Sequence, residues 1–350
     1  MKRHFYLYSL TAVILLFSSC GDDDGPAKPT GDYANGVFVV NEGNFGGGNA
    51  SISHFDPVSS TVSKDIFSKI NGAALGDVAQ SMYISGDQAY IVLNNSTKVE
   101  IVNYGTFAST GTITEGLANP RYLAVNGDRA FISNWGNFDE NFQLDQSFIA
   151  VVDLADNSLT SKIDTNDGVE HIFVFDGKLF VANSFTNTVQ AFDMDTHELL
   201  GTTELAQGPG QFAVDADDNL WVISQGNFAG NDGALTCINT TTYAIERRVG
   251  LDFNPANRLV ANDAANLLYF YQGNTIYQFS SRGAEPSTLA EMTDFVGIYG
   301  IGYDQVNELI YVSDAVGFGG EGKVVRLTVD GVEVDEFSVG TGPNSFVFTP

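Results

Sequence analysis

One pattern of hydrophobic and polar positions occurs seven times along the chain. The pattern is a strand of alternating residues, a polar loop and then a second alternating strand, which in most copies ends on Asn, Ser or another polar residue. The copies of this second strand are residues 37–41, 89–94, 130–134, 179–183, 220–224, 267–271 and 309–313. They begin about 40 to 50 residues apart, which is the period of a four-stranded propeller blade. The pattern therefore predicts an all-β fold, a seven-bladed β-propeller.

The strand before each copy is expected to line the central channel. These innermost strands are predicted at residues 79–84, 121–125, 171–175, 211–214, 258–260, 299–303 and 345–348. The last of them has no repeat after it, so we expect it to pair with the strand at 37–41 and to complete blade 1. Such closure removes the exposed edge strands that an open arrangement would leave. Residues 33–350 are accordingly predicted to form one closed domain.

The N-terminus resembles a lipoprotein export signal. Lys2 and Arg3 precede an apolar stretch at 10–17 that is too short to span a bilayer, and Ser18-Ser19-Cys20 resembles a lipobox. We expect a signal peptide at 1–19, lipidation of Cys20, and a flexible acidic linker at 20–32. The run Asp22 to Asp24 resembles a tag for export to the outer cell surface, although it would also serve merely to solubilise a tether. The expected location is the outer membrane, lipid-anchored and surface-exposed.

Charge and cysteine content exclude several functions. The formal net charge is −27, which disfavours nucleic acid and anionic lipid headgroups, so membrane contact is expected through the lipid anchor alone. A neutral, zwitterionic or cationic ligand is expected. Cys237 has no partner if Cys20 carries lipid, and it is interpreted as a small core residue.

The sequence contains no recognisable catalytic or metal-binding motif. His54, His171 and His197 are far apart in the sequence and lack His or Cys companions at ligand spacing, which argues against zinc. The acidic segment at 215–219 lacks the Gly and Glu of a calcium loop and is interpreted as a turn. We therefore expect neither an enzyme nor a bound metal or cofactor.

Two sets of loops are predicted to share one face of the propeller and to ring the channel mouth. The first set contains the triplet Gly-Asn-Phe at 43–45, 136–138 and 226–228. Gly and Asn tolerate positive φ, so the triplet could simply shape a turn, but aromatic and carboxamide side chains exposed together also form binding surfaces. The candidate ligand-binding residues of this set, with the Asn residues that end two of the strands, are Asn44, Phe45, Asn94, Trp135, Asn137, Phe138, Asn183, Phe185, Gln225, Asn227, Phe228 and Phe318.

The second set precedes the innermost strands and supplies further polar groups. Its candidate ligand-binding residues are Arg121, His171, Arg258, Tyr299 and Asn344. Because acidic residues are so abundant, Arg121 and Arg258 could equally be structural partners of carboxylates.

The segment at 36–45, followed by 49–52, 54–57 and later 180–183, resembles the YncE-like, surface-layer-type propeller lipoproteins of Bacteroidetes, and the likeness extends over 33–350. Within that group the chain most resembles the members that capture cobalamin. The resemblance implies binding of a corrinoid and its delivery to a TonB-dependent outer-membrane transporter of the BtuB type. A surface glycan-binding protein is the alternative, and a lyase or lactonase on the same scaffold is a third possibility.

Overall fold

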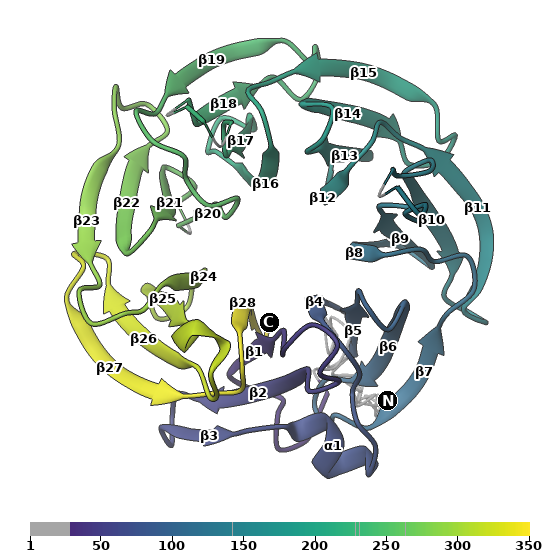
Figure 1. Cartoon of the computed structure of the whole chain (residues 1–350), viewed down its shortest axis with the longest axis vertical. Coiled ribbons are helices and arrows are strands. Elements are labelled where there is room, and N and C mark those ends of the chain that lie inside the picture. Colours follow the sequence, from purple (N-terminus) through teal and green to yellow (C-terminus); the bar gives the residue numbers. More distant parts are fainter. Residues whose placement is uncertain (1–28, 142, 228, 231, 263) are drawn as a thin grey trace, which may run out of the picture.

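The computed structural model describes residues 29–350 except 142, 228, 231 and 263. Seven four-stranded antiparallel sheets stand around a central channel (Figure 1). The predicted signal peptide, the lipidation site at Cys20 and the linker as far as residue 28 lie outside the described residues. At the end of that linker, Thr30 and Gly31 already lie against Gly105, and the backbone N–H of Tyr33 donates to the Gly105 carbonyl at 3.0 Å.

The strands of each blade are named from the channel outwards. Blade 1 contains β28 (Pro343–Phe348), β1 (Val37–Asn41), β2 (Ser51–Asp56) and β3 (Thr61–Ser63), and blade 2 contains β4 (Ala79–Ser85), β5 (Gln88–Leu93), β6 (Lys98–Asn103) and β7 (Ser109–Ile113). Blade 3 contains β8 (Pro120–Asn126), β9 (Arg129–Asn134), β10 (Phe148–Asp153) and β11 (Ser158–Asp164), and blade 4 contains β12 (Val169–Phe175), β13 (Lys178–Asn183), β14 (Thr188–Asp193) and β15 (Leu199–Glu204).

Blade 5 contains β16 (Pro209–Val214), β17 (Leu220–Ser224), β18 (Ala234–Ile238) and β19 (Ile245–Gly250), and blade 6 contains β20 (Val260–Ala261), β21 (Leu267–Gln272), β22 (Thr275–Ser280) and β23 (Ser287–Glu291). Blade 7 contains β24 (Ile298–Asp304), β25 (Leu309–Asp314), β26 (Lys323–Thr328) and β27 (Glu333–Ser338). The described residues add a six-residue helix, α1 (Ile66–Asn71), and a 3₁₀ turn, η1 (Val316–Phe318). In this part of the chain, no helix is long and apolar enough to cross a membrane.

The predicted closure of the ring is confirmed. β28 pairs antiparallel with β1, with Val39 opposite Phe346. The backbone N–H of Thr349 also donates to the Gly36 carbonyl at 3.1 Å. The last strand of the chain thus completes the blade that the first strand begins.

Large side chains on the second strand of each blade build the core. One stands three residues before the end of that strand in six blades and two residues before it in blade 2. All seven are at most 1% exposed: Phe38, Ile91, Phe131, Phe180, Trp221, Tyr269 and Tyr311. Burying an aromatic side chain of this size contributes about 2–3 kcal/mol each. The residues that end six of these strands, such as Asn41 and Asn183, are buried as well, whereas Gln272 at the end of β21 is exposed. The repeated sequence pattern therefore reflects the packing of neighbouring blades against one another.

A β-bulge occurs near the start of the innermost strand in six blades. The register shifts after the first residue in β4, β8, β12, β16, β24 and β28. A bulge sets two residues against one on the neighbouring strand and re-aims a side chain. In β8 and β12 the two residues are polar, Arg121-Tyr122 and Glu170-His171. The bulge explains how successive polar residues of one strand contribute to the same channel.

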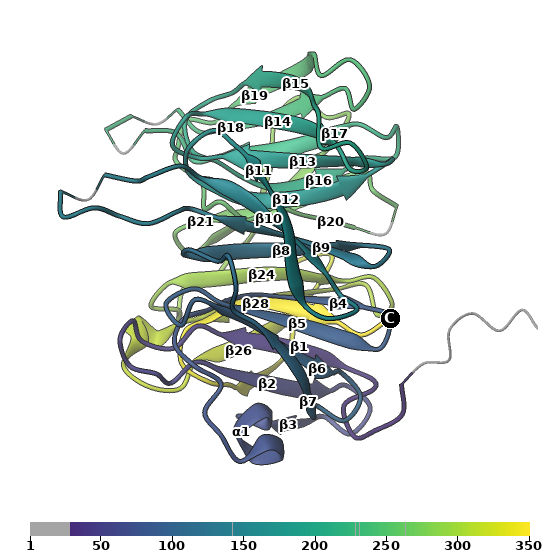
Figure 2. The same ribbon diagram turned by 90° about the vertical axis from the view of Figure 1, so that its right-hand side faces the viewer.

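The two faces of the ring differ. The connections between second and third strands, and those between blades, form what we call the loop face; the long loops after β9 and β17 project from it (Figure 2). The opposite face, which we call the terminus face, carries the other connections and the C-terminus. The described N-terminal residues enter β1 from the terminus face as well, since β1 runs from that face to the loop face.

Candidate ligand-binding face and channel

The three Gly-Asn-Phe loops share one internal hydrogen bond. The backbone N–H of Asn137 donates to Asp145 Oδ1 at 2.7 Å, and that of Asn227 donates to Asp232 Oδ1 at 2.7 Å. In blade 1 the N–H of Asn44 donates to the side chain of Asn49 at 2.8 Å. We call this bond the loop clamp. It ties the two arms of each loop together.

The glycine of the triplet is required by the clamp. Gly136 has φ +95°, and a Cβ there would lie 2.2 Å from Asp145 Oδ1; Gly226 has φ +79°, and its Cβ would lie 2.5 Å from Asp232 Oδ1. Left-handed backbone and lack of space both exclude other residues. The amides of Asn137 and Asn227 also donate to these carboxylates, at 3.2 and 2.8 Å. The turn-shaping interpretation is therefore correct for Gly and for these two Asn side chains.

The Phe side chains behave differently from the Asn side chains. Phe45 is 81% exposed and Phe138 is 44% exposed, and neither packs down on the blade edge as a core residue does. Phe185, in the corresponding loop of blade 4, is 53% exposed. Phe228 lies outside the described residues. Exposed aromatic side chains gathered on a protein surface mark interaction sites.

Three aromatic residues form a cluster on the loop face. The ring of Trp135 lies 6.4 Å from that of Phe138, edge to face, and 5.4 Å from that of Phe185. We call Trp135, Phe138 and Phe185 the aromatic cluster. Beneath it, the guanidinium of Arg121 lies 4.1 Å from the Trp135 ring centre, a cation–π contact.

Arg121 is held by a bidentate ion pair. Its Nε and Nη2 donate to the two oxygens of Glu170 at 2.9 and 2.7 Å. The side chains are 13% and 4% exposed, so the pair is shielded from water. The structural alternative for Arg121 is therefore correct, and its position under Trp135 supports the cluster from within.

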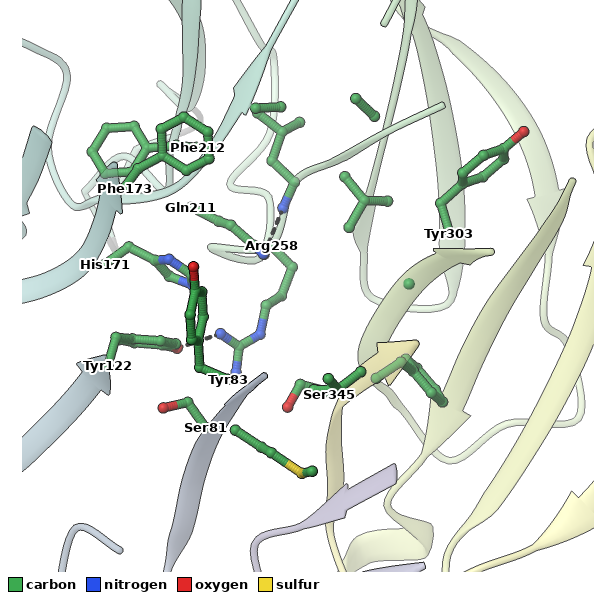
Figure 3. A pocket seen from close by; sticks show the side chains of 18 of the residues that line it. Ser81, Tyr83, Tyr122, His171, Phe173, Gln211, Phe212, Arg258, Tyr303 and Ser345 are labelled. Carbon is green, nitrogen blue, oxygen red and sulfur yellow. Dashed lines mark hydrogen bonds between the residues drawn. The ribbon is translucent and has the colours of Figure 1, made fainter. Parts of the chain in front are cut away.

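A second group of polar side chains crosses the channel just inside this pair. Tyr122 stacks on His171 with ring centres 3.8 Å apart, and Arg258 Nη1 donates to the Tyr122 hydroxyl (Figure 3). Gln80 Nε2 donates to the same hydroxyl at 3.3 Å. Burial lowers the pKa of His171 well below its ordinary value of 6.5, and the guanidinium groups of Arg258 and Arg121 lower it further. His171 is therefore neutral at pH 7.

Arg121, Glu170, Tyr122, His171 and Arg258 together are called the polar layer below. Arg258 precedes the two-residue strand β20 and does not lie within it, so the prediction that 258–260 forms the innermost strand of blade 6 is correct only at its end. Tyr122 was not among the predicted site residues. The sequence does contain a sign of its role, because the alternation of polar and apolar residues breaks at Arg121-Tyr122. A β-bulge at such a break lets both residues face the channel.

Tyr299 and Phe318 form a separate group at the loop face of blade 7. The Tyr299 hydroxyl donates to the Glu42 carboxylate, and the Phe318 ring meets Tyr299 edge to face at 5.1 Å. Burial and the Glu42 charge raise the pKa of Tyr299. Both side chains are half-buried.

Three predicted site residues lie under the loops. Asn94 is 9% exposed and donates to the Pro120 carbonyl at 3.1 Å, Asn183 is fully buried and donates to Gln190, and Asn344 donates to the Ala79 carbonyl at 2.9 Å. Their amides hold neighbouring segments together and do not reach the surface. Gln225 is half-buried beside Gly208, and the side chain of Asn44 is exposed.

The described residues contain no group of three or more His, Cys, Asp and Glu side chains that could hold a metal ion. Asp215 caps a turn, where its Oδ1 accepts from the N–H of Asn219 at 3.0 Å and its Oδ2 from Trp221 Nε1 at 2.8 Å. Cys237 is buried, and burial raises its thiol pKa to about 12. It is a core residue, as predicted.

Solved structures share the fold at low sequence identity. A quinoprotein alcohol dehydrogenase-like protein from Bacteroides thetaiotaomicron aligns with TM-score 0.71 and 17% identity over 91% of this chain and 79% of its own. A functionally unknown protein from Desulfotomaculum acetoxidans has TM-score 0.68 and 13% identity over 90% and 98%. A putative 6-phosphogluconolactonase from Bacteroides fragilis has TM-score 0.66 and 13% identity over 92% and 100%. At these identities the likeness concerns the fold alone.

Among proteins with curated functions, none has a sequence that matches this chain. Residues 35–336 match the family described as "Domain of unknown function (DUF5074)". That match spans most of the propeller, from the residues before β1 into β27. The chain belongs to this family.

Proposed function

We propose that the protein is a non-catalytic cell-surface lipoprotein that captures a corrinoid at its loop face. The observation that carries the proposal is the aromatic cluster, in which Phe138 and Phe185 are 44% and 53% exposed beside Trp135. The cluster is fixed from below by the buried Arg121–Glu170 pair and at its side by the loop clamp of blade 3. A rigid, preformed apolar surface loses little conformational entropy on binding.

The chemistry of the loop face fits a large neutral ligand with an amide fringe. Cobalamin is such a molecule, and its ring edges and benzimidazole would lie against Phe and Trp side chains. Exposed Asn44 offers a carbonyl and an amide group to the fringe. Further apolar surface comes from Phe45, 81% exposed, and Val296, 70% exposed. The sequence resemblance to the cobalamin-capturing lipoprotein BtuG supports the same ligand.

The orientation of the domain sets how a ligand would be passed on. We propose lipidation at Cys20 and delivery to a TonB-dependent transporter of the BtuB type. Eight residues lie between Cys20 and Pro29, a reach of at most about 30 Å, and the chain enters the propeller on the terminus face. The loop face would thus point away from the membrane while it captures ligand, and delivery would require the domain to turn on its tether.

Calorimetric titration tests ligand capture. The full chain carrying Cys20→Ala, which cannot be lipidated, is expected to bind cyanocobalamin at micromolar concentration or tighter. Phe138→Ala together with Phe185→Ala should weaken binding at least tenfold, because both remove exposed ring surface. Val306→Ala is the matched control: Val306 is 86% exposed in the connection after β24, on the terminus face.

Absence of binding heat and of any corrinoid spectral change with the unsubstituted chain would refute the proposal. A glycan array would then test the alternative, since aromatic and carboxamide groups also suit sugars. Turnover that survives Trp135→Ala and is lost in His171→Ala would instead favour a lactonase or lyase.

Exposure to protease on intact cells tests the location. The lipidated protein should be cleaved by protease added to whole cells, and Cys20→Ala should release it from the membrane. Protection in intact cells would contradict the surface location.

A further inference from the structure

A cavity of about 460 Å³ lies in the channel on the terminus side of the polar layer. Its inner end is formed by Tyr122, His171, Gln211 and Arg258, and it extends to Gln305, in the connection between β24 and β25 on the terminus face. Figure 3 shows the guanidinium of Arg258 directed towards Tyr122. The aromatic cluster belongs to the opposite face, so the cavity is a separate site.

Arg258 lacks the counter-charge that the other shielded arginines have. Arg121 pairs with Glu170, and Arg326, 9% exposed at its side chain, pairs with Asp335. Among the described residues, Arg258 makes no ion pair, and its recorded acceptor is the neutral hydroxyl of Tyr122. Glu170 has both oxygens occupied by Arg121, and Glu42 accepts from Tyr299.

A guanidinium in such a place favours an anion. Arg258 is half-buried and the Glu170 charge stabilises it without forming an ion pair with it, so an anion that binds the guanidinium directly would stabilise this charge further. One further donor lines the cavity, the side-chain amide of Gln211, whereas the hydroxyls of Ser81 and Ser345 already donate to the Arg121 carbonyl and to Asn344 Oδ1. Gln211 Oε1 accepts from the N–H of Leu259 at 3.1 Å, which leaves its amide NH₂ to the cavity. His171 is neutral, so the layer offers one unbalanced positive charge.

The rest of the cavity wall is mainly apolar, with Tyr83, Tyr303 and Gln305 as its polar members. Beyond the polar layer the lining passes to Met82, Ile172, Phe173, Phe212, Val260 and Phe346. A ligand that fills the cavity would therefore bury an apolar body against these residues. The net charge of −27 makes the approach of a polyanion unfavourable. These properties together favour a ligand that has an apolar body and a single negative charge at one end.

We propose that the channel holds a second ligand site, for an amphipathic monoanion whose carboxylate or sulfonate binds Arg258 and whose apolar body lies towards the terminus face. This site is independent of the proposed corrinoid site.

Two probes that differ by one group test the proposal. The anion 8-anilinonaphthalene-1-sulfonate and the neutral N-phenyl-1-naphthylamine have the same apolar rings, and only the first has a charge. In fluorescence titrations of the full chain carrying Cys20→Ala, the sulfonate should bind with one-to-one stoichiometry and at least tenfold more tightly than the neutral probe.

Two variants place the charge requirement at Arg258. Arg258→Gln should weaken the sulfonate at least tenfold and change the neutral probe less than twofold. Gln211→Glu supplies an internal carboxylate for Arg258 and keeps the acceptor for the Leu259 N–H. It should likewise weaken binding of the sulfonate at least tenfold, and it should raise Tm. Arg248→Gln, which removes an exposed charge from the outer strand β19, is the matched control and should change neither probe.

The Gln211→Glu variant keeps the test decisive if Arg258→Gln does not fold. Equal affinity for the two probes, or sulfonate binding that is unchanged in Gln211→Glu, would overturn the proposal. Loss of corrinoid binding in Phe138→Ala with Phe185→Ala, without any change in sulfonate affinity, would confirm that the two sites are separate.

Discussion

The aromatic cluster and the channel cavity are built by opposite means, the cluster on blades 3 and 4 and the cavity on the innermost segments of all seven blades. The cluster stands on loops after β9 and β13, is largely exposed, and is held in place by one clamp and one ion pair. The cavity is built on bulged strands and closed by charged and aromatic side chains deep in the molecule. The comparison indicates that substitutions on these loops should cost little stability, whereas substitutions in the polar layer should cost more.

Two phenylalanines of blade 4 sharpen this comparison most. Phe180 is fully buried in β13 and Phe185 is 53% exposed in the loop after it. Phe180→Ala should cost about 3–5 kcal/mol in the free energy of unfolding, because it leaves a cavity between blades. Phe185→Ala should cost less than about 0.5 kcal/mol. Urea unfolding of the two variants measures both, and similar losses would contradict the assignment of Phe185 to a binding surface.

The ion pair beneath the cluster is the next largest effect. Glu170→Gln leaves the shielded guanidinium of Arg121 without a counter-charge and should cost about 3 kcal/mol. Asp195→Asn is the control, since its pair with Arg129 has the carboxylate 86% exposed, and it should leave stability unchanged. A small effect of Glu170→Gln would show that water reaches the pair. The Trp135 fluorescence should also change, because Arg121 lies against its ring.

Removing the loop clamps should act locally. Asp145→Ala and Asp232→Ala each delete the acceptor for a backbone N–H and a side-chain amide. We expect a loss of about 1–2 kcal/mol at most and faster hydrogen exchange at Asn137 and Asn227. Exchange in β9 and β17 should stay as it is. Faster exchange throughout the two blades would mean that the loops and the blades unfold together.

The smallest expected effect is on the pH dependence of stability. The pKa of His171 is lowered by burial and by Arg258 and Arg121, so the unfolded chain binds its proton at a higher pH than the folded chain does. Stability should therefore fall as pH decreases below about 6.5, by at most about 1.4 kcal/mol per pH unit from this group. His54 and His197 have lowered pKa values too and act in the same direction.

Unfolding in urea at pH 7.0, 6.0 and 5.5 measures this slope. His171→Gln should reduce the slope of stability against pH by the contribution of His171, while the contributions of His54 and His197 remain. An unchanged slope would show that His171 is protonated in the folded protein or that it titrates at its ordinary pKa.

The sequence was sufficient for the architecture and for part of the site. Local alternation and a repeat of about 40 to 50 residues predict seven blades, and the unmatched strand at the C-terminus predicts the closure that β28 makes with β1. The exposed Phe residues of the Gly-Asn-Phe loops were predicted as well. The burial of Asn94, Asn183 and Asn344 was not, because an Asn at the end of a strand looks the same whether it meets solvent or the carbonyl of another segment.

What the sequence alone determines is the order, length and polarity of the strands, since these depend on residues near one another in the chain. Only the tertiary structure decides which polar residues face each other across the channel. Arg258 and Tyr122 lie 136 positions apart and meet because ring closure brings blades 3 and 6 to opposite sides of one cavity. Whether an arginine has a carboxylate partner, as Arg121 has and Arg258 has not, depends on that meeting. No pattern along the chain records it.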